Sequence, residues 1–357
     1  MPRKRLLEDP SDSISINIGS NSANIAAGRN VSQISNTWLE QEKRVEHPER
    51  FRSRKQTNVA SLKGKIDFGI ISIKEEEFEA VIKRFKYNTN DNYKAQNRTY
   101  VISRLPINDI DQYTIAIVRC IEQGTNAAHD TARDMIEDLD PGWILLVGIG
   151  GAVPAAEFTL GDVVIARRLH DFCIEENLEE GVIYGARGGP MEKEVNDIIS
   201  LLKSMRDKIK GWNSQRSIGM KKPIVDLENP KKFYGSKEWR RDVKEKLSLH
   251  YGPDIKTRPP GFTDLPVASS DRLIKSTITV EQWRKVTRDV GLFEMELTGV
   301  YEAAHRKGKT YPVLAIRGIS DIVGFKRSRD WTNYACNSAA AFAHAFIGAR
   351  IIEPKSI

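Results

Sequence analysis

Apolar and amphipathic segments alternate along the chain from about residue 65. Apolar runs of strand length lie at 66–73, 113–120, 143–148, 162–166 and 313–317, with a further candidate at 266–270. Helices are expected from apolar spacing or composition at 75–85, 127–139, 294–300 and 334–347. Strands that alternate with helices predict an α/β fold, a three-layer αβα sandwich around a central mixed β-sheet.

One of these runs, Trp143 to Gly148, is apolar over its whole length and leads into Gly150-Gly151. Such a run is typical of a central strand that is buried on both faces of a sheet. At the start of the helix that precedes it, Asn126 is a candidate N-cap. Ligands of α/β sheets bind beyond the carboxyl ends of the strands, so we expect a binding site next to these glycines.

Two domains are expected, a polar N-terminal tail over 1–62 and a globular domain over 63–357. Within the tail, residues 16–21 (Ile-Asn-Ile-Gly-Ser-Asn) recur nine residues later as 25–30 (Ile-Ala-Ala-Gly-Arg-Asn). Short uncharged strands followed by turns can stack between chains, because like side chains then form ladders. The repeat resembles the N-terminal amyloid-type signalling motifs of some defence effectors. A polar leader without fixed structure is the alternative.

A helical, basic insertion is expected at about 185–262. Apolar residues fall on one helical face near its start and on another near its end: Val195, Ile198, Ile199, Leu202 and Met205, then Trp239, Val243 and Leu247. From residue 187 to 258 there are 18 Lys and Arg against 10 Asp and Glu. This segment alone therefore has a net charge of +8, compared with +7 for the whole chain. Either a polyanion binds near this segment or its charges form a solvated surface. Nucleic acid is not the expected partner.

The composition argues against membrane, disulfide and metal-centred classes. Hydrophobic residues make up 40% of the chain, but no uninterrupted apolar run is long enough to cross a bilayer. No apolar segment follows the basic start, so a secretory signal is not expected and we place the protein in the cytoplasm. Cys120, Cys173 and Cys336 lack metal-ligand spacing and are interpreted as buried free thiols. No metal or other cofactor is expected.

Four separated motifs carry the chemistry, and they occur in a fixed order: Gly69-Ile70-Ile71 leading to Glu75-Glu76-Glu77, Val147-Gly148-Ile149-Gly150-Gly151, Glu294-Met295-Glu296, and Arg317-Gly318-Ile319-Ser320-Asp321. In this order they resemble the purine nucleoside phosphorylase and methylthioadenosine nucleosidase superfamily, over about residues 65–348. Four ordered motifs are far more specific than a single glycine pair.

The resemblance implies cleavage of the bond between a purine and its ribose through an oxocarbenium-like transition state. Asp321 resembles the general acid that protonates purine N7, for which burial would have to raise its pKa. Glu77 resembles the carboxylate that orients or deprotonates the attacking water. Glu296 resembles the acceptor for the ribose 2′ and 3′ hydroxyls, and Met295 the side chain that packs on the sugar. The structural alternatives are a surface glutamate, a core methionine and a helix-capping aspartate.

Further substrate contacts are expected from the same motifs and from the segment after residue 268. Those within the motifs are Ile149, Gly150, Arg317 and Ser320. Asp271 and Leu273 resemble residues at the base pocket. Lys74, Arg272 and Lys275 are candidate contacts for substrate phosphates.

The resemblance also covers phosphorylases, whose bound phosphate is held by arginines. Here the corresponding neighbourhood reads Lys74-Glu75-Glu76-Glu77, and a carboxylate would repel phosphate, which favours hydrolysis. The basic insertion favours a purine nucleotide such as ATP, and the leader favours a nucleotide-depleting effector of antiviral defence. Assembly as a homo-oligomer and an upstream sensor are the expected partners. The alternatives are a housekeeping methylthioadenosine or adenosylhomocysteine nucleosidase, a purine nucleoside phosphorylase, and a non-catalytic nucleotide-sensing scaffold.

Overall fold

The structure is a computed structural model that describes residues 62–86, 91–108, 111–178, 181–306 and 308–355. Of the two units into which the chain divides, Met1–Gln56 and Thr57–Ile357, the second contains every described residue. The predicted assembly segment 1–62 lies outside the described residues, apart from Leu62.

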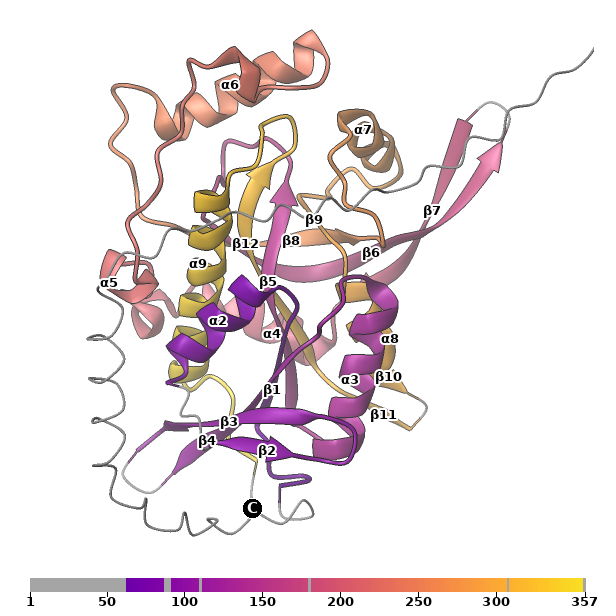
Figure 1. Ribbon diagram of the computed structural model, residues 1–357, viewed down its shortest axis with the longest axis vertical. Helices are drawn as coiled ribbons and strands as arrows, with labels where there is room; N and C mark the ends of the chain where they lie inside the picture. The colour runs from indigo at the N-terminus through magenta and orange to yellow at the C-terminus, as the bar shows by residue number, and fades with distance from the viewer. Residues whose placement is uncertain (1–61, 87–90, 109–110, 179–180, 307, 356–357) are drawn as a thin grey trace, which may run out of the picture. The chain divides into compact units, whose positions relative to one another are not determined.

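The centre of the sheet is built from parallel strands. Strand β1 (Phe68–Ser72) pairs in parallel with β4 (Gln112–Arg119) and β5 (Trp143–Ala152), and β5 pairs in parallel with β12 (Val313–Ile322). Every residue of β5 except Gly151 is buried, as its apolar run predicted. The carboxyl ends of β1, β5 and β12 therefore lie at one edge of the sheet (Figure 1).

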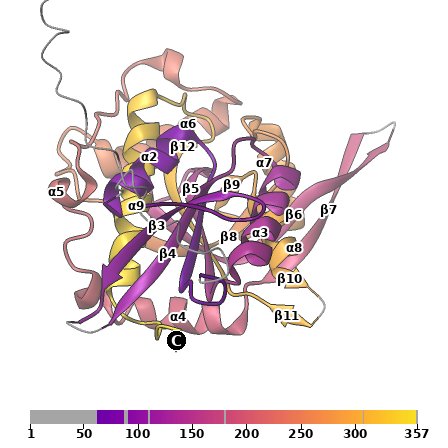
Figure 2. The same cartoon turned by 60° about the horizontal axis from the view of Figure 1, so that its bottom comes forward.

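Antiparallel strands extend this centre on both sides and make the sheet mixed. On one side β4 pairs with β3 (Thr99–Pro106), which pairs with β2 (Asn92–Lys94). On the other side β12 pairs with the first residues of β6 (Val163–Leu178), and β6 continues as a hairpin with β7 (Gly181–Pro190). This hairpin projects away from the body of the domain (Figures 1 and 2).

The remaining strands are β8 to β11. β8 (Phe262–Ser269) pairs with both β6 and β9 (Leu292–Glu294), and β9 also pairs with the end of β5. A separate two-stranded sheet joins β10 (His305–Arg306) to β11 (Lys309–Thr310). The three residues of β9 bring Glu294 to the carboxyl end of β5, because Phe293 pairs with Gly151.

Helices cover both faces of the sheet and confirm the three-layer αβα architecture (Figure 1). α2 (Glu75–Arg84) packs on α9 (Arg329–Gly348), and α3 (Thr125–Leu139) packs on α8 (Leu297–Ala304). The second pair is closely packed, because a Cβ atom on Gly299 would lie 1.9 Å from the Thr125 carbonyl oxygen. Only glycine fits at that contact.

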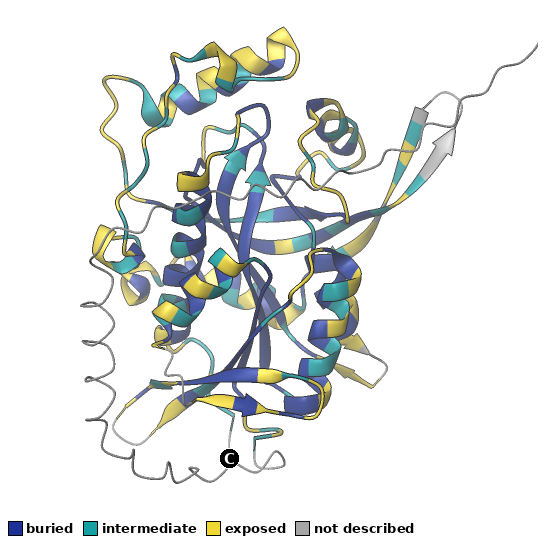
Figure 3. Ribbon diagram, viewed as in Figure 1, coloured by how far each residue is buried: buried dark blue, intermediate teal, exposed yellow. Residues whose placement is uncertain are grey.

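The segment between β7 and β8 is largely helical, and a further helix, α7 (Thr277–Val286), follows β8. The segment between β7 and β8 contains α4 (Lys193–Leu202), α5 (Gln215–Ile218) and α6 (Lys237–Tyr251), with short 3₁₀ turns at Arg206–Ile209 and Pro230–Lys232. In α6 the buried residues are the predicted Trp239, Val243 and Leu247, while the opposite face is exposed (Figure 3). Residues 185–190 are not part of this helical segment but belong to strand β7, because they pair with β6.

Strand β12 runs past residue 317 to Ile322, so Ser320 and Asp321 lie at its end, with a register shift between Ile319 and Asp321. Two sequence predictions of local structure are wrong. Glu294 does not lie in a helix: it ends strand β9, and α8 begins only at Leu297. Asn126 does not cap α3, whose N-cap residue is Gly124.

The described residues contain no helix long and apolar enough to cross a membrane. Within the same residues no group of His, Cys, Asp and Glu side chains is arranged to hold a metal ion. All three cysteines are free; Cys120 and Cys336 are buried, and Cys173 is partly exposed. Burial raises the pKa of the Cys173 thiol to about 11, so it is a weak nucleophile near neutral pH.

Candidate active site

A cavity opens where the carboxyl ends of β1, β5 and β12 meet α2 and the start of α8. It encloses about 630 Å³, counting the part that is open to solvent. The predicted site residues that line it are Lys74, Glu77, Ile149, Gly150, Leu273, Met295, Glu296, Ser320 and Asp321. The structure therefore brings together residues from all four sequence motifs.

Glu77 is a buried carboxylate at the first turn of α2. One of its oxygens accepts hydrogen bonds from the backbone N–H groups of Ile73 and Lys74, at 3.0 and 2.9 Å. The other oxygen accepts from the N–H of Ile149, at 3.0 Å. The bond from Lys74, the N-cap residue, is the one that the third helical residue makes in a capping box. The bond from Ile149 connects the helix to β5. Three backbone donors hold this carboxyl group at the cavity wall.

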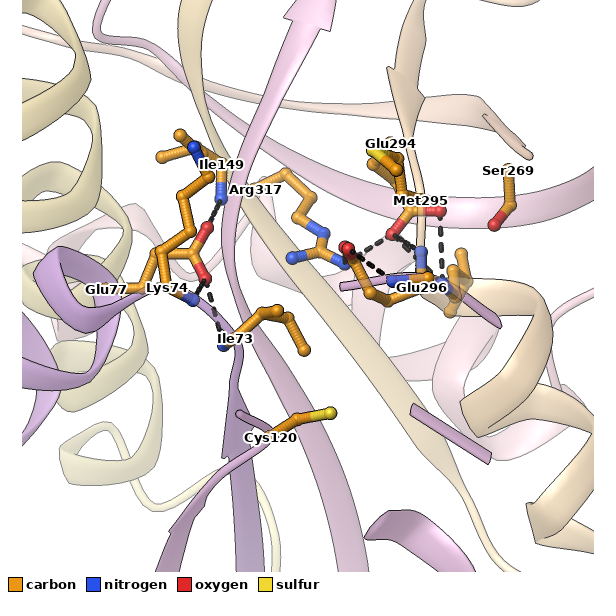
Figure 4. A network of polar contacts seen from close by, with 12 residues as sticks. Ile73, Lys74, Glu77, Cys120, Ile149, Ser269, Glu294, Met295, Glu296 and Arg317 are labelled. Carbon is orange, nitrogen blue, oxygen red and sulfur yellow. Dashed lines mark hydrogen bonds and ion pairs between the residues drawn. The ribbon is translucent and has the colours of Figure 1, made fainter. Parts of the chain in front are cut away.

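Arg317 lies between two groups of acidic side chains (Figure 4). Its guanidinium, 1% exposed, donates to Glu294 Oε2 and lies 3.4 Å from Glu296 Oε2. A Cβ atom on Gly148 would lie 2.4 Å from Arg317 Nη1 and 2.7 Å from Glu77 Oε1, so glycine leaves room for both groups. Buried Nε and Nη1 of Arg317 have no hydrogen-bond partner among the described residues. These donors are available to a water or a substrate oxygen.

Glu294 and Glu296 have different tasks although they are two residues apart. The Glu294 carboxylate accepts from the N–H groups of Glu296 and Leu297, at 3.0 to 3.1 Å, and so covers the N-terminus of α8. Glu296 receives only a long contact from the N–H of Gly124, at 3.4 Å, besides Arg317. Its oxygens are thus less committed to the protein and can accept from a ligand.

Burial raises the pKa of Glu296 to about 8, Arg317 counteracts this, and the neighbouring Glu294 and Glu77 add to it. Between the ordinary value of 4.5 and about 8 the folded protein keeps a proton that the unfolded chain releases. The free energy of unfolding should therefore fall as pH rises through this window, by up to about 1.4 kcal/mol per pH unit from this group. Glu296→Gln should flatten that slope in urea denaturation curves, and parallel pH profiles for the two proteins would contradict the assignment.

Asp321 faces the cavity from β12, just after the register shift in that strand. Its Oδ1 accepts a hydrogen bond from the Ser320 hydroxyl at 2.6 Å and lies 3.7 Å from Arg327 Nε. The side chain is 14% exposed, so a ligand in the cavity can reach it. The Ser320 hydroxyl also lies 3.3 Å from the Gly150 carbonyl oxygen, which ties β12 to β5 at this point.

Arg317 and Asp271, both predicted site residues, do not line the cavity. Arg317 lies behind its wall and acts on Glu294 and Glu296. Asp271 accepts a hydrogen bond from the N–H of Thr125 at 2.6 Å, and so serves as the capping group of α3 from a distant part of the chain. Neither placement was evident from the sequence, because each depends on a contact between distant segments.

Three cationic side chains line the cavity: Lys74, Arg272 and Arg327. Arg272 forms a bidentate ion pair with Glu175 on the β6–β7 hairpin and is largely exposed. Arg327 donates from Nε to the Thr332 hydroxyl at 2.9 Å, and its buried Nη2 has no partner among the described residues. Lys275, the third phosphate contact suggested by the sequence, does not line the cavity.

Sequence reasoning missed Glu294 and Arg327 as parts of the site. Glu294 stands inside a recognised motif, and its position two residues before Glu296 could have identified it. Arg327 lies beyond the last motif, and only the turn after β12 brings it back towards Asp321. Gly151 of the second motif also lines the cavity, and other lining residues without a sequence signal are Ile73, Gln123, Ile274 and Phe293.

Residues 67–348 match the model of the phosphorylase superfamily, and the chain belongs to this family. Among solved structures it is similar to an S-adenosylhomocysteine nucleosidase from Streptococcus pyogenes, with a TM-score of 0.54 and 17% identity over 81% of this chain and 99% of that one. It is also similar to futalosine hydrolase of Helicobacter pylori, with a TM-score of 0.50 and 14% identity over 79% and 97% of the two chains. At these identities the likeness concerns the fold.

A curated relative is a death domain-containing ATP nucleosidase from Amphimedon queenslandica, 26% identical over 224 residues. The match covers 62% of this chain and 36% of the relative. The chain thus spans little more than a third of the length of that protein.

Proposed function

We propose that this protein is an N-glycosidase that hydrolyses the bond between a purine and its ribose, with adenine nucleotides and above all ATP as substrate. The observation that carries the proposal is the convergence of Asp321 and Glu296 on one cavity, together with Glu77. The fold shared with nucleosidases and the similarity to an ATP nucleosidase support it.

The three carboxyl groups divide the reaction between them. Asp321 donates a proton to the leaving purine, with the Ser320 hydroxyl fixing the orientation of its carboxyl group. Glu296 accepts hydrogen bonds from the ribose hydroxyls, and Met295 packs beside the sugar. Glu77, whose carboxylate lines the cavity, orients the attacking water.

Hydrolysis is favoured over phosphorolysis by the position of Glu77. A phosphate ion at this end of the cavity would meet a buried carboxylate fixed by three backbone N–H groups. The sugar should therefore be released as free ribose or as its 5′-phosphate ester, and not as ribose 1-phosphate. Adding inorganic phosphate should leave the rate of purine release and the sugar product unchanged.

A nucleotide is favoured over methylthioadenosine by the three cations of the cavity. Methylthioadenosine is neutral beyond its base and offers no partner for Lys74, Arg272 or Arg327. Incubation with adenosine, methylthioadenosine, AMP, ATP and GTP, followed by chromatography, tests the proposal. We expect free adenine from ATP at the highest kcat/KM; a protein that leaves all five compounds intact overturns it.

Lys74→Gln should separate nucleotide from nucleoside cleavage. If Lys74 contacts the phosphates, its loss should weaken ATP cleavage about tenfold in KM and leave adenosine cleavage unchanged, since one charge-assisted contact is removed. Steady-state kinetics on both substrates measures the split. Lys83→Gln, an exposed lysine on the same helix, is the matched control. An equal effect on adenosine would show that Lys74 supports the site in another way.

The proposal includes a biological role as a nucleotide-depleting effector in antiviral defence, with residues 63–357 as the catalytic domain and 185–262 as a basic insertion within it. Residues 1–62, with their strand repeat, would assemble the chain as a homo-oligomer or connect it to an upstream sensor. A deletion of residues 1–56 should keep ATP cleavage but lose assembly-dependent activation. Size-exclusion chromatography with a parallel activity assay checks both effects.

A further inference from the structure

A second cavity lies on the helical segment between β7 and β8. It encloses about 1020 Å³, counting the part open to solvent, and shares no lining residue with the catalytic cavity. Its walls come from the segments 213–225 and 251–259 and from Tyr334 of α9.

The cavity carries an excess of positive charge. Lys221, Lys222 and Arg258 line it, and Arg258 forms a bidentate ion pair with Asp162, at 2.7 and 2.5 Å. Asp162 also accepts from the N–H groups of Thr159 and Gly261, so its oxygens are fully used. The neighbouring carboxylate is therefore not available to the two lysines.

Lys222 is the cation that lacks an anionic partner. Its ammonium donates to the Arg258 carbonyl oxygen at 2.9 Å and lies 5.2 and 6.0 Å from the ring centres of Tyr251 and Trp331. No carboxylate of the described residues lies within ion-pair distance of it. Burial lowers the pKa of Lys222 to about 8, Asp162 counteracts this, and Arg258 adds to it. An anion bound beside the ammonium would give it a direct ionic partner.

Backbone hydrogen bonds connect this cavity to the catalytic strand. The Asp162 carbonyl oxygen accepts from the N–H of Ile319, and the N–H of Gly161 donates to the Ile319 carbonyl oxygen, both at 2.8 Å. Tyr251, from the cavity wall, donates its hydroxyl to the Leu160 carbonyl oxygen at 2.9 Å. Ile319 stands two residues before Asp321, at the register shift of β12. The segment 160–162 thus connects Tyr251 and Arg258 of the cavity wall to β12 two residues before Asp321.

We propose that this second cavity is a regulatory site for a phosphate group, carried by a nucleotide or as the free ion. Lys222 is the principal contact, Lys221 adds a second cation, and Arg258 holds the segment 160–162 in place through Asp162. A ligand that orders this segment changes the position of Ser320 and Asp321 through the two hydrogen bonds to Ile319. The binding step does not depend on which reaction the catalytic cavity performs.

The test is a titration of the full-length protein with inorganic phosphate and with AMP, followed by calorimetry and amide hydrogen exchange. Lys222→Gln should bind the phosphate group of either probe at this site about tenfold more weakly. Lys222→Arg should retain binding. Lys208→Gln, an exposed lysine outside both cavities, is the matched control and should behave as the wild type.

Exchange rates identify the site. Both probes should slow exchange in peptides that cover 158–162 in the wild type and not in Lys222→Gln, whereas protection of 316–322 by AMP bound in the catalytic cavity should be the same in both proteins. Tighter binding of AMP than of phosphate, lost with Lys222, identifies a nucleotide site; equal binding identifies a site for the ion. Unchanged affinity and protection in Lys222→Gln would overturn the proposal. A failure of purine release alone would leave these results unaffected, since none of them uses catalytic activity.

Discussion

Replacing Asp321 by asparagine is expected to reduce the rate of purine release by about 10²- to 10⁴-fold. Asparagine keeps the shape of the side chain but has no carboxyl proton to give to the leaving base. The reduction should appear in kcat and in kcat/KM alike, because the proton is needed in the transition state and contributes little to substrate binding. Chromatographic measurement of adenine released from ATP determines both parameters.

Asp330→Asn is the matched control for this variant. Asp330 lies nearby on the first turn of α9, is exposed and does not line the cavity. Equal loss in both variants would point to a general effect on folding, which thermal unfolding would reveal. If Asp321→Asn instead retained full biological activity, the scaffold interpretation would replace the enzymatic one.

The core of the fold could be predicted because its strands are long and uniformly apolar. β1, β5 and the first residues of β12 are buried on both faces, and their composition alone distinguishes them from helices. β3 and β2 were not predicted, because they lie near the sheet edge and mix polar with apolar residues. β9 has only three residues, too few for any periodicity to show.

Most residues that line the candidate site could be predicted from the sequence motifs, but the interactions among them could not. The sequence places Glu294 and Arg317 on separate segments, and nothing local indicates that their side chains meet in the interior. Likewise the capping of α3 by Asp271 joins positions 146 residues apart. Such contacts follow from the strand order, in which β9 lies against β5, and strand order is set by the packing of the whole sheet.

Replacing Arg317 by methionine is expected to destabilise the protein by about 3–5 kcal/mol near pH 8. The substitution leaves the carboxyl groups of Glu294 and Glu296 buried without their cation, and removing one partner of a buried ion pair is costly. Urea denaturation monitored by circular dichroism gives the free energy of unfolding. Arg104→Met, which removes an exposed arginine from β3, should change it by less than about 0.5 kcal/mol.

The pH dependence of this variant separates loss of charge compensation from loss of packing. Arg317 lowers the pKa of Glu296, so its loss raises that pKa further, and the stability deficit of Arg317→Met should grow as pH rises beyond about 8. Adding Glu294→Gln to Arg317→Met should recover part of the deficit, because one of the two carboxyl groups left without their cation is then gone. A deficit that is constant with pH and insensitive to Glu294→Gln would instead assign Arg317 a role in packing, and the charge-based account of Glu296 would fail with it.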